Sequence, residues 1–186
     1  MTSKTVQMRS RLTYLTYMAL LITFAVVIHT VEAALPVPMP VPGVRLGLAN
    51  IITLLALIIF GLRSALLVAV MRSFLGSLFF GGLFSFGFWL SLGGGLISTL
   101  VMALVLLAYN RGYVSLVSVS IIGAAAHNFT QLALASLIIG TFTLLQGYLP
   151  LLLLLSVPTG FFTGLAVHYL SGVTARIIGQ VGDGGN

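Results

Sequence analysis

Charged residues and cysteine are what this sequence has least of. Asp, Glu, Lys and Arg together make up 5% of its 186 residues, apolar and aromatic residues make up 59%, and cysteine is absent. Because a soluble domain has about 25% charged residues, too few polar side chains are present to cover a water-exposed surface. Without cysteine, disulfides and thiolate metal sites are excluded. The sequence therefore predicts a protein whose main solvent is the lipid bilayer.

Acidic residues are the scarcest charged class, with two carboxylates against eight Lys and Arg and a formal net charge of +6. The basic residues stand singly between apolar runs instead of gathering in one patch. A nucleic-acid interface needs clustered basic residues, so we expect no nucleic-acid partner. Isolated basic residues beside apolar runs indicate membrane topology.

The apolar runs predict an all-α, polytopic bundle of six transmembrane helices, forming one integral membrane domain over residues 1–186. About 20 helical residues cross the hydrocarbon core. Runs of about that length occur at residues 12–35, 44–60, 64–81, 94–109, 115–139 and 148–170. The alternating prolines of residues 36–43 exclude a continuous helix there. The Gly-rich but apolar residues 82–93 predict an interfacial or re-entrant segment.

The Lys and Arg residues predict the orientation, because cytoplasmic loops carry the excess of these residues. They fall before the first span, between spans two and three, between spans four and five, and after span six: Lys4, Arg9, Arg11, Arg63, Arg111 and Arg176. The intervening segments 36–43, 82–93 and 140–147 contain no Lys or Arg. We therefore expect a multi-pass protein of the cell membrane with both termini in the cytoplasm.

Ionisable residues within the spans are candidates for function, because each costs about 2.5–3.5 kcal/mol at the centre of a membrane helix on insertion scales. Arg72 falls in the middle of the third span, too deep to reach either interface easily. Glu32 ends the first span and Arg45 begins the second, so these two side chains are candidates for an ion pair. Arg72 then lacks a carboxylate, which leaves two alternatives: an anionic ligand, or solvation by backbone carbonyls and water.

Polar residues on the fifth span form a second candidate group. His127 and Gln131 are four residues apart, and Asn128 and Gln131 are three apart, which predicts that they share a helix face. Hydrogen bonds between helices and contacts with a ligand both remain open for them. Asn50, one turn into the second span, has the same two alternatives.

The residues needed for catalysis are missing, so we expect no enzyme activity and no catalytic or metal-binding residues. One carboxylate within the spans cannot form an acid–base pair, and three dispersed histidines show no metal spacing. The sequence also has no G-x-x-x-x-G-K-[ST] loop for binding nucleotide phosphates.

Four segments together resemble the Gx transporter family: the proline loop 36–43, Gly-Val-Arg-Leu-Gly-Leu-Ala-Asn at 43–50, Gly-Gly-Gly-Leu-Ile-Ser at 93–98 and Gly-Ala-Ala-Ala-His-Asn at 123–128. This family is also labelled heptaprenyl diphosphate synthase component I, and it is similar to the S components of energy-coupling factor (ECF) transporters. The resemblance implies a six-helix bundle. Prenyl diphosphate chemistry uses Asp-rich motifs that hold Mg²⁺, whereas this chain has one aspartate, so the synthase label does not describe its own catalysis.

The resemblance implies a flavin ligand, FAD, FMN or riboflavin, because members of the family accompany flavinyltransferase and Rnf-type redox systems. FAD moved outward for the flavinylation of extracytosolic proteins is the function we expect. Its binding site would open outward between segments 36–43, 82–93 and 140–147. Two alternatives remain: uptake of riboflavin or another vitamin, and a non-catalytic membrane subunit of a prenyl or quinone pathway enzyme.

The expected roles follow from the chemistry of a flavin nucleotide. Arginines suit the phosphates, amides suit the heteroaromatic edge, and aromatic rings suit stacking. The candidate substrate-binding residues are Glu32, Arg45, Asn50, Arg72, Phe86, Trp89, His127, Asn128 and Gln131. An energy-coupling ATPase module is the partner that the resemblance implies. However, the Ala-x-x-x-Ala docking pattern of S components is missing from the first span, where Ala19 and Ala25 are six residues apart.

The predicted topology can be tested directly, because the chain has no native cysteine to interfere with labelling. Single cysteines introduced at Met39 and Thr143 should react with an impermeant thiol reagent added outside intact cells. Cysteines introduced at Arg63 and Arg111 should react only after the membrane is opened. The reverse pattern would show that the orientation is inverted.

Overall fold

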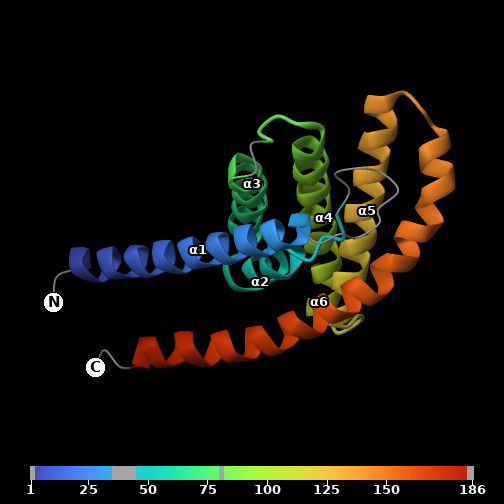
Figure 1. The fold of residues 1–186 in the computed structure, drawn as a ribbon. Helices are drawn as coiled ribbons and strands as arrows, with labels where there is room; N and C mark the ends of the chain where they lie inside the picture. Colours follow the sequence, from blue (N-terminus) through green and yellow to red (C-terminus); the bar gives the residue numbers. More distant parts are fainter. Residues whose placement is uncertain (1–2, 35–44, 80–81, 184–186) are drawn as a thin grey trace.

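The computed structural model of the protein describes residues 3–34, 45–79 and 82–183, with side chains described for residues 11–34, 45–79 and 82–172. The proline-rich segment 36–43 and its expected part in the site lie outside these residues. The described chain forms six α-helices (Figure 1): α1 (Ser3–Ala34), α2 (Asn50–Phe60), α3 (Leu62–Phe79), α4 (Phe86–Asn110), α5 (Leu116–Ile139) and α6 (Thr143–Asp183).

The predicted all-α, polytopic membrane bundle is confirmed, but the six helices are not equal in length. Five are long and apolar enough to cross a membrane, whereas α2 has 11 residues. At 1.5 Å per residue, α2 is about 16 Å long, roughly half of the hydrocarbon thickness. The prediction of a span over residues 44–60 was wrong because residues 45–47 are not helical and Gly47 has a φ of 83°.

Helix α4 corrects a second prediction, that of an interfacial or re-entrant segment at residues 82–93. Most of this segment is the first part of α4, which runs for 25 residues. Ser85 caps the helix, since its side chain accepts a hydrogen bond from the backbone N–H of Phe88. Gly93, Gly94 and Gly95 lie inside the helix, where they admit side chains of α3 and α5 at close range. Glycine here serves helix packing and does not break the helix.

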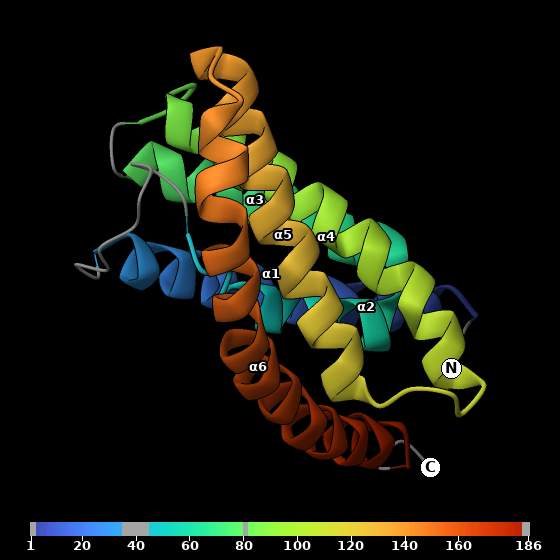
Figure 2. The same cartoon turned by 90° about the vertical axis from the view of Figure 1, so that its right-hand side faces the viewer.

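Helix α6 begins at Thr143, five residues before the predicted start of the sixth span at residue 148. It contains Pro150 and Pro158 and follows a curved path in two views (Figures 1 and 2). A proline inside a helix removes one backbone hydrogen bond and bends the axis. The predicted outer loop 140–147 is correspondingly short, with Gly140 in a left-handed conformation at the end of α5.

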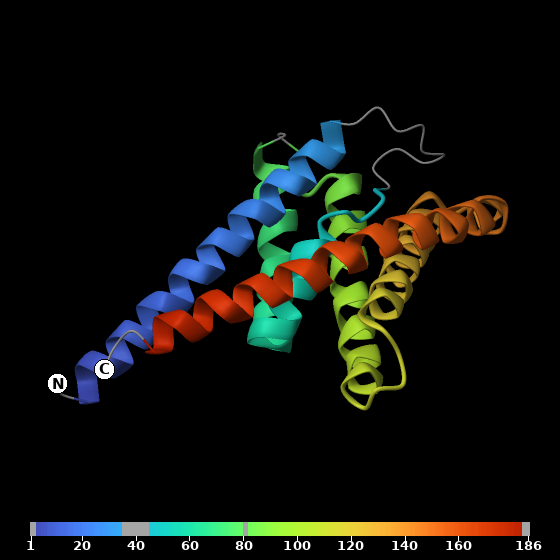
Figure 3. The same cartoon turned by 90° about the horizontal axis from the view of Figure 1, so that it is seen from below.

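The short helix α2 lies at the centre of the bundle and contacts every other helix. Helix α5 packs between α4 and α6, and α3 packs against α1 and α4. The start of α1 and the end of α6 lie at the same end of the molecule (Figures 1 and 3). That arrangement is required if both termini are cytoplasmic, and which side they face stays a prediction.

The outside of the bundle is apolar, as a lipid-facing surface should be. Large side chains such as Leu104, Leu137 and Leu154 are exposed. Most of the charged and hydrogen-bonding groups within the spans are instead buried. The bundle therefore has an apolar exterior and a polar centre, the reverse of a soluble protein.

Two glycines on α6 let it approach α5 closely. A Cβ atom at Gly164 would lie 2.7 Å from the Cα atom of Val117, and one at Gly160 would clash with the backbone of Ile121. Replacing Gly164 with alanine should therefore push α6 away from α5 and destabilise the protein by about 1–3 kcal/mol, the usual cost of overpacking. Unfolding in mixed detergent micelles measures this loss.

Gly147 on the same helix is the matched control, because a Cβ atom there would meet nothing within 4 Å. Gly147→Ala should leave stability unchanged or raise it slightly through helix propensity. Equal effects of the two substitutions would mean that the glycines of α6 do not act through packing.

Candidate functional site

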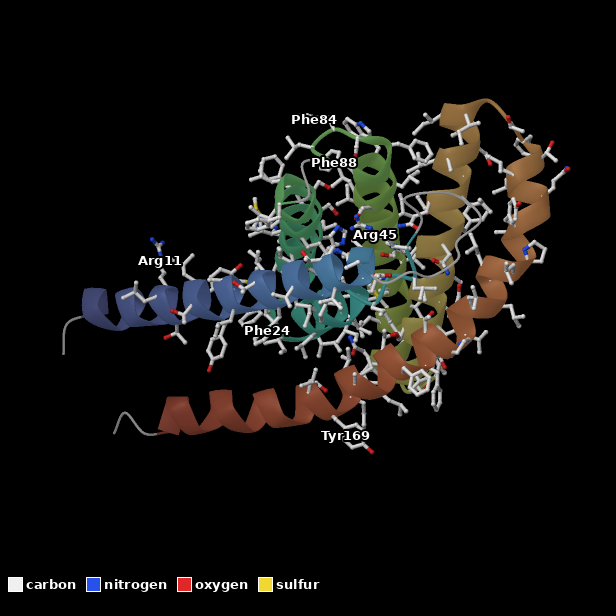
Figure 4. All side chains as sticks on the ribbon, in the orientation of Figure 1. Arg11, Phe24, Arg45, Phe84, Phe88 and Tyr169 are labelled. Atoms are coloured by element: carbon white, nitrogen blue, oxygen red, sulfur yellow. The ribbon has the colours of Figure 1, made fainter. Side chains whose placement is uncertain are left out.

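Polar side chains from α1, α2, α3 and α5 meet at the centre of the bundle, together with the segment that precedes α2. We call this group the central polar cluster. Its members are His29 and Glu32 of α1, Arg45 and Gly47 before α2, Asn50 of α2, Arg72 of α3, and His127 and Gln131 of α5. Arg45 lies among the helices at the centre of the bundle, where its guanidinium bonds to His29 of α1, whereas Arg11 projects from the exposed part of α1 (Figure 4).

The segment before α2 is held in place by two backbone hydrogen bonds to side chains of the cluster. The N–H of Arg45 donates to Oε1 of Gln131 at 2.9 Å, and the N–H of Gly47 donates to Oε1 of Glu32 at 2.6 Å. At Gly47 the positive φ favours glycine, and a Cβ atom there would lie 2.9 Å from the His127 ring. This segment therefore links α1 to α5 across the bundle.

Arg72 is the largest fully buried side chain in the protein's described residues, with 1% of its surface exposed. Its Nη2 donates to Oδ1 of Asn50 at 2.9 Å. The Nε of Arg72 and the Nδ2 of Asn50 have no hydrogen-bond partner among the described residues. A Cβ atom at Gly95 would lie 2.9 Å from Nη2, so α4 closes over the guanidinium. At least one N–H donor of Arg72 therefore has no acceptor among the described residues.

Glu32 and Arg45, the predicted ion pair, are near each other but bond to other groups. The Arg45 guanidinium donates to Nε2 of His29, while Glu32 accepts the Gly47 N–H. Glu32 also interacts electrostatically with both Arg45 and Arg72. One carboxylate therefore serves as the counter-ion of two arginines.

The three polar residues of α5 point in two directions. Nε2 of His127 lies 2.9 Å from Nε2 of Gln131, and both pack against Gly94 of α4, so these two share the predicted face. Asn128 instead faces α6, where its amide donates to the carbonyl of Leu152 at 3.1 Å and to the hydroxyl of Ser156 at 2.9 Å. A separation of one residue turns a side chain about 100° around a helix, which places Asn128 in the interface between α5 and α6.

Phe86 and Trp89 lie at the start of α4, away from the cluster. Trp89 is exposed and packs edge-to-face on Phe88, and Phe86 is half-buried beside Leu90. Along the helix axis, Trp89 and Phe86 are about 9 and 13 Å from Gly95, at 1.5 Å per residue. The structure does not bring them together with the arginines.

His29, Gly47, Gly94 and Gly95 belong to the site or pack against it, although none of them was among the predicted site residues. His29 stands three residues before Glu32 on α1, a spacing that puts two side chains on one helix face. That signal could have found it. The glycines have no side chain to signal a role, and only the packing of the other helices shows why they are needed. In the described part of the chain, no three His, Asp or Glu side chains form a metal site.

A profile of the family described as heptaprenyl diphosphate synthase component I matches residues 21–170. The chain belongs to this family. Comparisons with curated proteins and with solved structures found no match. The matched region of this component I family member contains every residue of the central polar cluster, with Glu32 as its one carboxylate.

The hydrogen bond from Arg72 to Asn50 can be tested by two substitutions of similar size. Asn50→Leu removes the acceptor from a buried guanidinium and should destabilise the protein by about 1.5–3 kcal/mol, the range for hydrogen bonds to charged groups. Asn50→Asp keeps an acceptor at the same place and should lose less stability. Unfolding in mixed detergent micelles gives both values. If Asn50→Leu unfolds no more easily than Asn50→Asp, the contact is not important for stability.

Proposed function

We propose that this membrane protein is a transporter, similar to an ECF S component, that binds a flavin nucleotide in the central polar cluster. The ligand we propose is FAD, moved outward for the flavinylation of extracytosolic proteins. On this proposal the chain has no catalytic activity of its own. The observation that carries the proposal is the excess of positive charge inside the bundle, where buried Arg72 and half-buried Arg45 share the single carboxylate of Glu32.

Buried charge supports an anionic ligand in particular. In a medium of low dielectric constant, an uncompensated charge is costly, and a second anion beside two guanidinium groups lowers that cost. Arginine donates hydrogen bonds to phosphate oxygens in a bidentate geometry. The free Nε of Arg72 offers a donor for such a contact.

Amide groups of the cluster support an aromatic ligand with a hydrogen-bonding edge. Nδ2 of Asn50 has no partner among the described residues. Oε1 of Gln131 holds the backbone of Arg45, and release of that bond would free a second amide. The choice of a flavin over other anions of this kind rests on the family resemblance of the sequence.

Access to the cluster would require the segment before α2 to move. Two backbone hydrogen bonds hold this segment over the polar side chains, one to Gln131 and one to Glu32. Helix α2 follows this segment and is too short to span the membrane. A shift of α2 would therefore not displace a membrane-spanning helix. We propose that these two bonds break when the ligand enters.

A second function is favoured by the family description, which names a component of a prenyl diphosphate synthase. The matched region has a single carboxylate, too few to hold Mg²⁺ against a diphosphate. This alternative therefore assigns the chain the role of a non-catalytic membrane subunit. Uptake of riboflavin or another vitamin by the same fold is a further alternative, and it needs no buried arginine for phosphate.

Titration of FAD, FMN and riboflavin against the purified protein separates these functions. Arg72→Gln should weaken FAD and FMN more than about tenfold, since losing one partner of a buried charged contact costs about 2–5 kcal/mol. Riboflavin, which lacks phosphate, should bind nearly as well as before. Arg63→Gln is the control, because Arg63 is an exposed arginine on the same helix. Equal losses for all three flavins would show that Arg72 is structural and would sink its phosphate role.

A further inference from the structure

The hydrogen bonds of the central polar cluster determine the charge of its two imidazoles. A guanidinium can only donate, so Nε2 of His29 accepts from Arg45 and has no proton. Oε1 of Gln131 accepts from the backbone N–H of Arg45, which leaves the amide Nε2 of Gln131 as a donor. Nε2 of His127 then accepts from Gln131. Both histidines are therefore neutral, with the ring proton on Nδ1.

With neutral imidazoles, the charge of the cluster follows from three groups. When Glu32 is ionised, its one negative charge stands against the two positive charges of Arg45 and Arg72, and the empty cluster carries a single positive charge. A diphosphate such as that of FAD has one negative charge on each phosphate. Binding a diphosphate would change the net charge of the cluster from one positive to one negative. In a site of low dielectric constant, that net negative charge costs as much free energy as the net positive charge that it replaces.

One proton taken up by the cluster would make the loaded site neutral, and the surroundings of Glu32 show where it goes. Glu32 interacts with Arg45 before α2 and with Arg72 on α3, and the other titratable groups of the cluster are His29 on its own helix and His127 on α5. Elsewhere in the cluster, Asn50 of α2 accepts from Arg72, and Gly94 and Gly95 of α4 pack against His127, Gln131 and Arg72. The arginines are already protonated. The two histidines would each lose an accepted hydrogen bond on gaining a proton at Nε2.

Glu32 can accept the proton without breaking its contact to the backbone. Its Oε1 holds the Gly47 N–H, and a neutral carboxyl keeps a carbonyl oxygen for that bond. An incoming phosphate that engages both guanidinium groups also takes away the positive charge that favours the ionised form of Glu32. The ligand and the carboxylate thus compete for the same two arginines.

We propose that Glu32 takes up one proton from water whenever a dianionic ligand binds the central polar cluster, an inference that rests on the proposed function. The loaded site is then neutral, and ligand and proton enter and leave it together. By linkage, the affinity for the ligand rises as the pH falls. A proton gradient directed inward would favour uptake through such a site, so outward delivery of FAD requires an energy-coupling partner or a steep gradient of FAD itself.

Calorimetric titration of FAD in two buffers of different ionisation enthalpy, at one pH, counts the protons. FAD is the probe because its diphosphate has no second titration near neutral pH. The wild-type protein should take up about one proton with each FAD, and its affinity should rise by up to about tenfold per pH unit lowered. Riboflavin should bind without proton uptake, because it leaves Glu32 beside its arginines.

Glu32→Gln imitates the protonated side chain and keeps an oxygen for the Gly47 N–H. This variant should bind FAD with no proton uptake and no pH dependence, and at pH 8 more tightly than the wild type. Asp183→Asn, which removes the other carboxylate of the chain outside the family match, should behave as the wild type does.

The outcomes are distinct. FAD binding to the wild type without proton uptake overturns this inference and leaves the proposed function standing. This measurement needs only the wild-type protein, so it tests the inference even if Glu32→Gln does not fold. Proton uptake that persists in a folded Glu32→Gln overturns the assignment to Glu32. Absence of any binding by FAD overturns the proposed function and this inference together.

Discussion

A guanidinium group buried in an apolar bundle has to be solvated by the protein itself, and this constraint organises the centre of the molecule. Arg72 obtains an acceptor from Asn50, which stands in the first turn of α2. Asn50 is in reach because α2 begins late, after the turn at Gly47. Glu32 of α1 holds this turn by accepting a hydrogen bond from the backbone of Gly47. Three helices are thus tied together by the need to surround one charge.

Close approach of the helices is the second requirement, and glycine meets it. Hydrogen bonds weaken steeply with distance and poor angle, so the polar groups have to lie within about 3 Å of each other. Gly94 and Gly95 remove side chains from the face of α4 that covers His127, Gln131 and Arg72. On the other side of α5, Gly164 of α6 does the same against the backbone. Small residues therefore set how tightly α5 is enclosed by its two neighbours.

The cluster has more polarity than the fold requires. Packing alone would be served by apolar residues, and replacing a buried ionic network by apolar side chains often leaves a protein as stable as before. Two arginines, two histidines and a carboxylate inside the family match therefore support the ligand site that we propose. Neutral histidines that accept hydrogen bonds from fixed donors make the cluster a site with a defined charge. On the proposed function, such a site would select ligands by charge as well as by shape.

Composition determined that this chain is a membrane protein, because 5% charged residues cannot cover a surface in water, and the apolar runs of about 20 residues determined that it is all-α. The depth of Arg72 and the partnership of His127 and Gln131 also followed from the sequence, since both depend on position within one helix. What lies between helices was decided by tertiary structure. Asn128 turned toward α6, residues 86–93 became the first turns of α4, and α2 began late, with Arg45 placed inside the bundle. Local sequence determines which residues share a face of one helix. Which group a side chain on that face contacts depends on other helices, whose residues are distant along the chain.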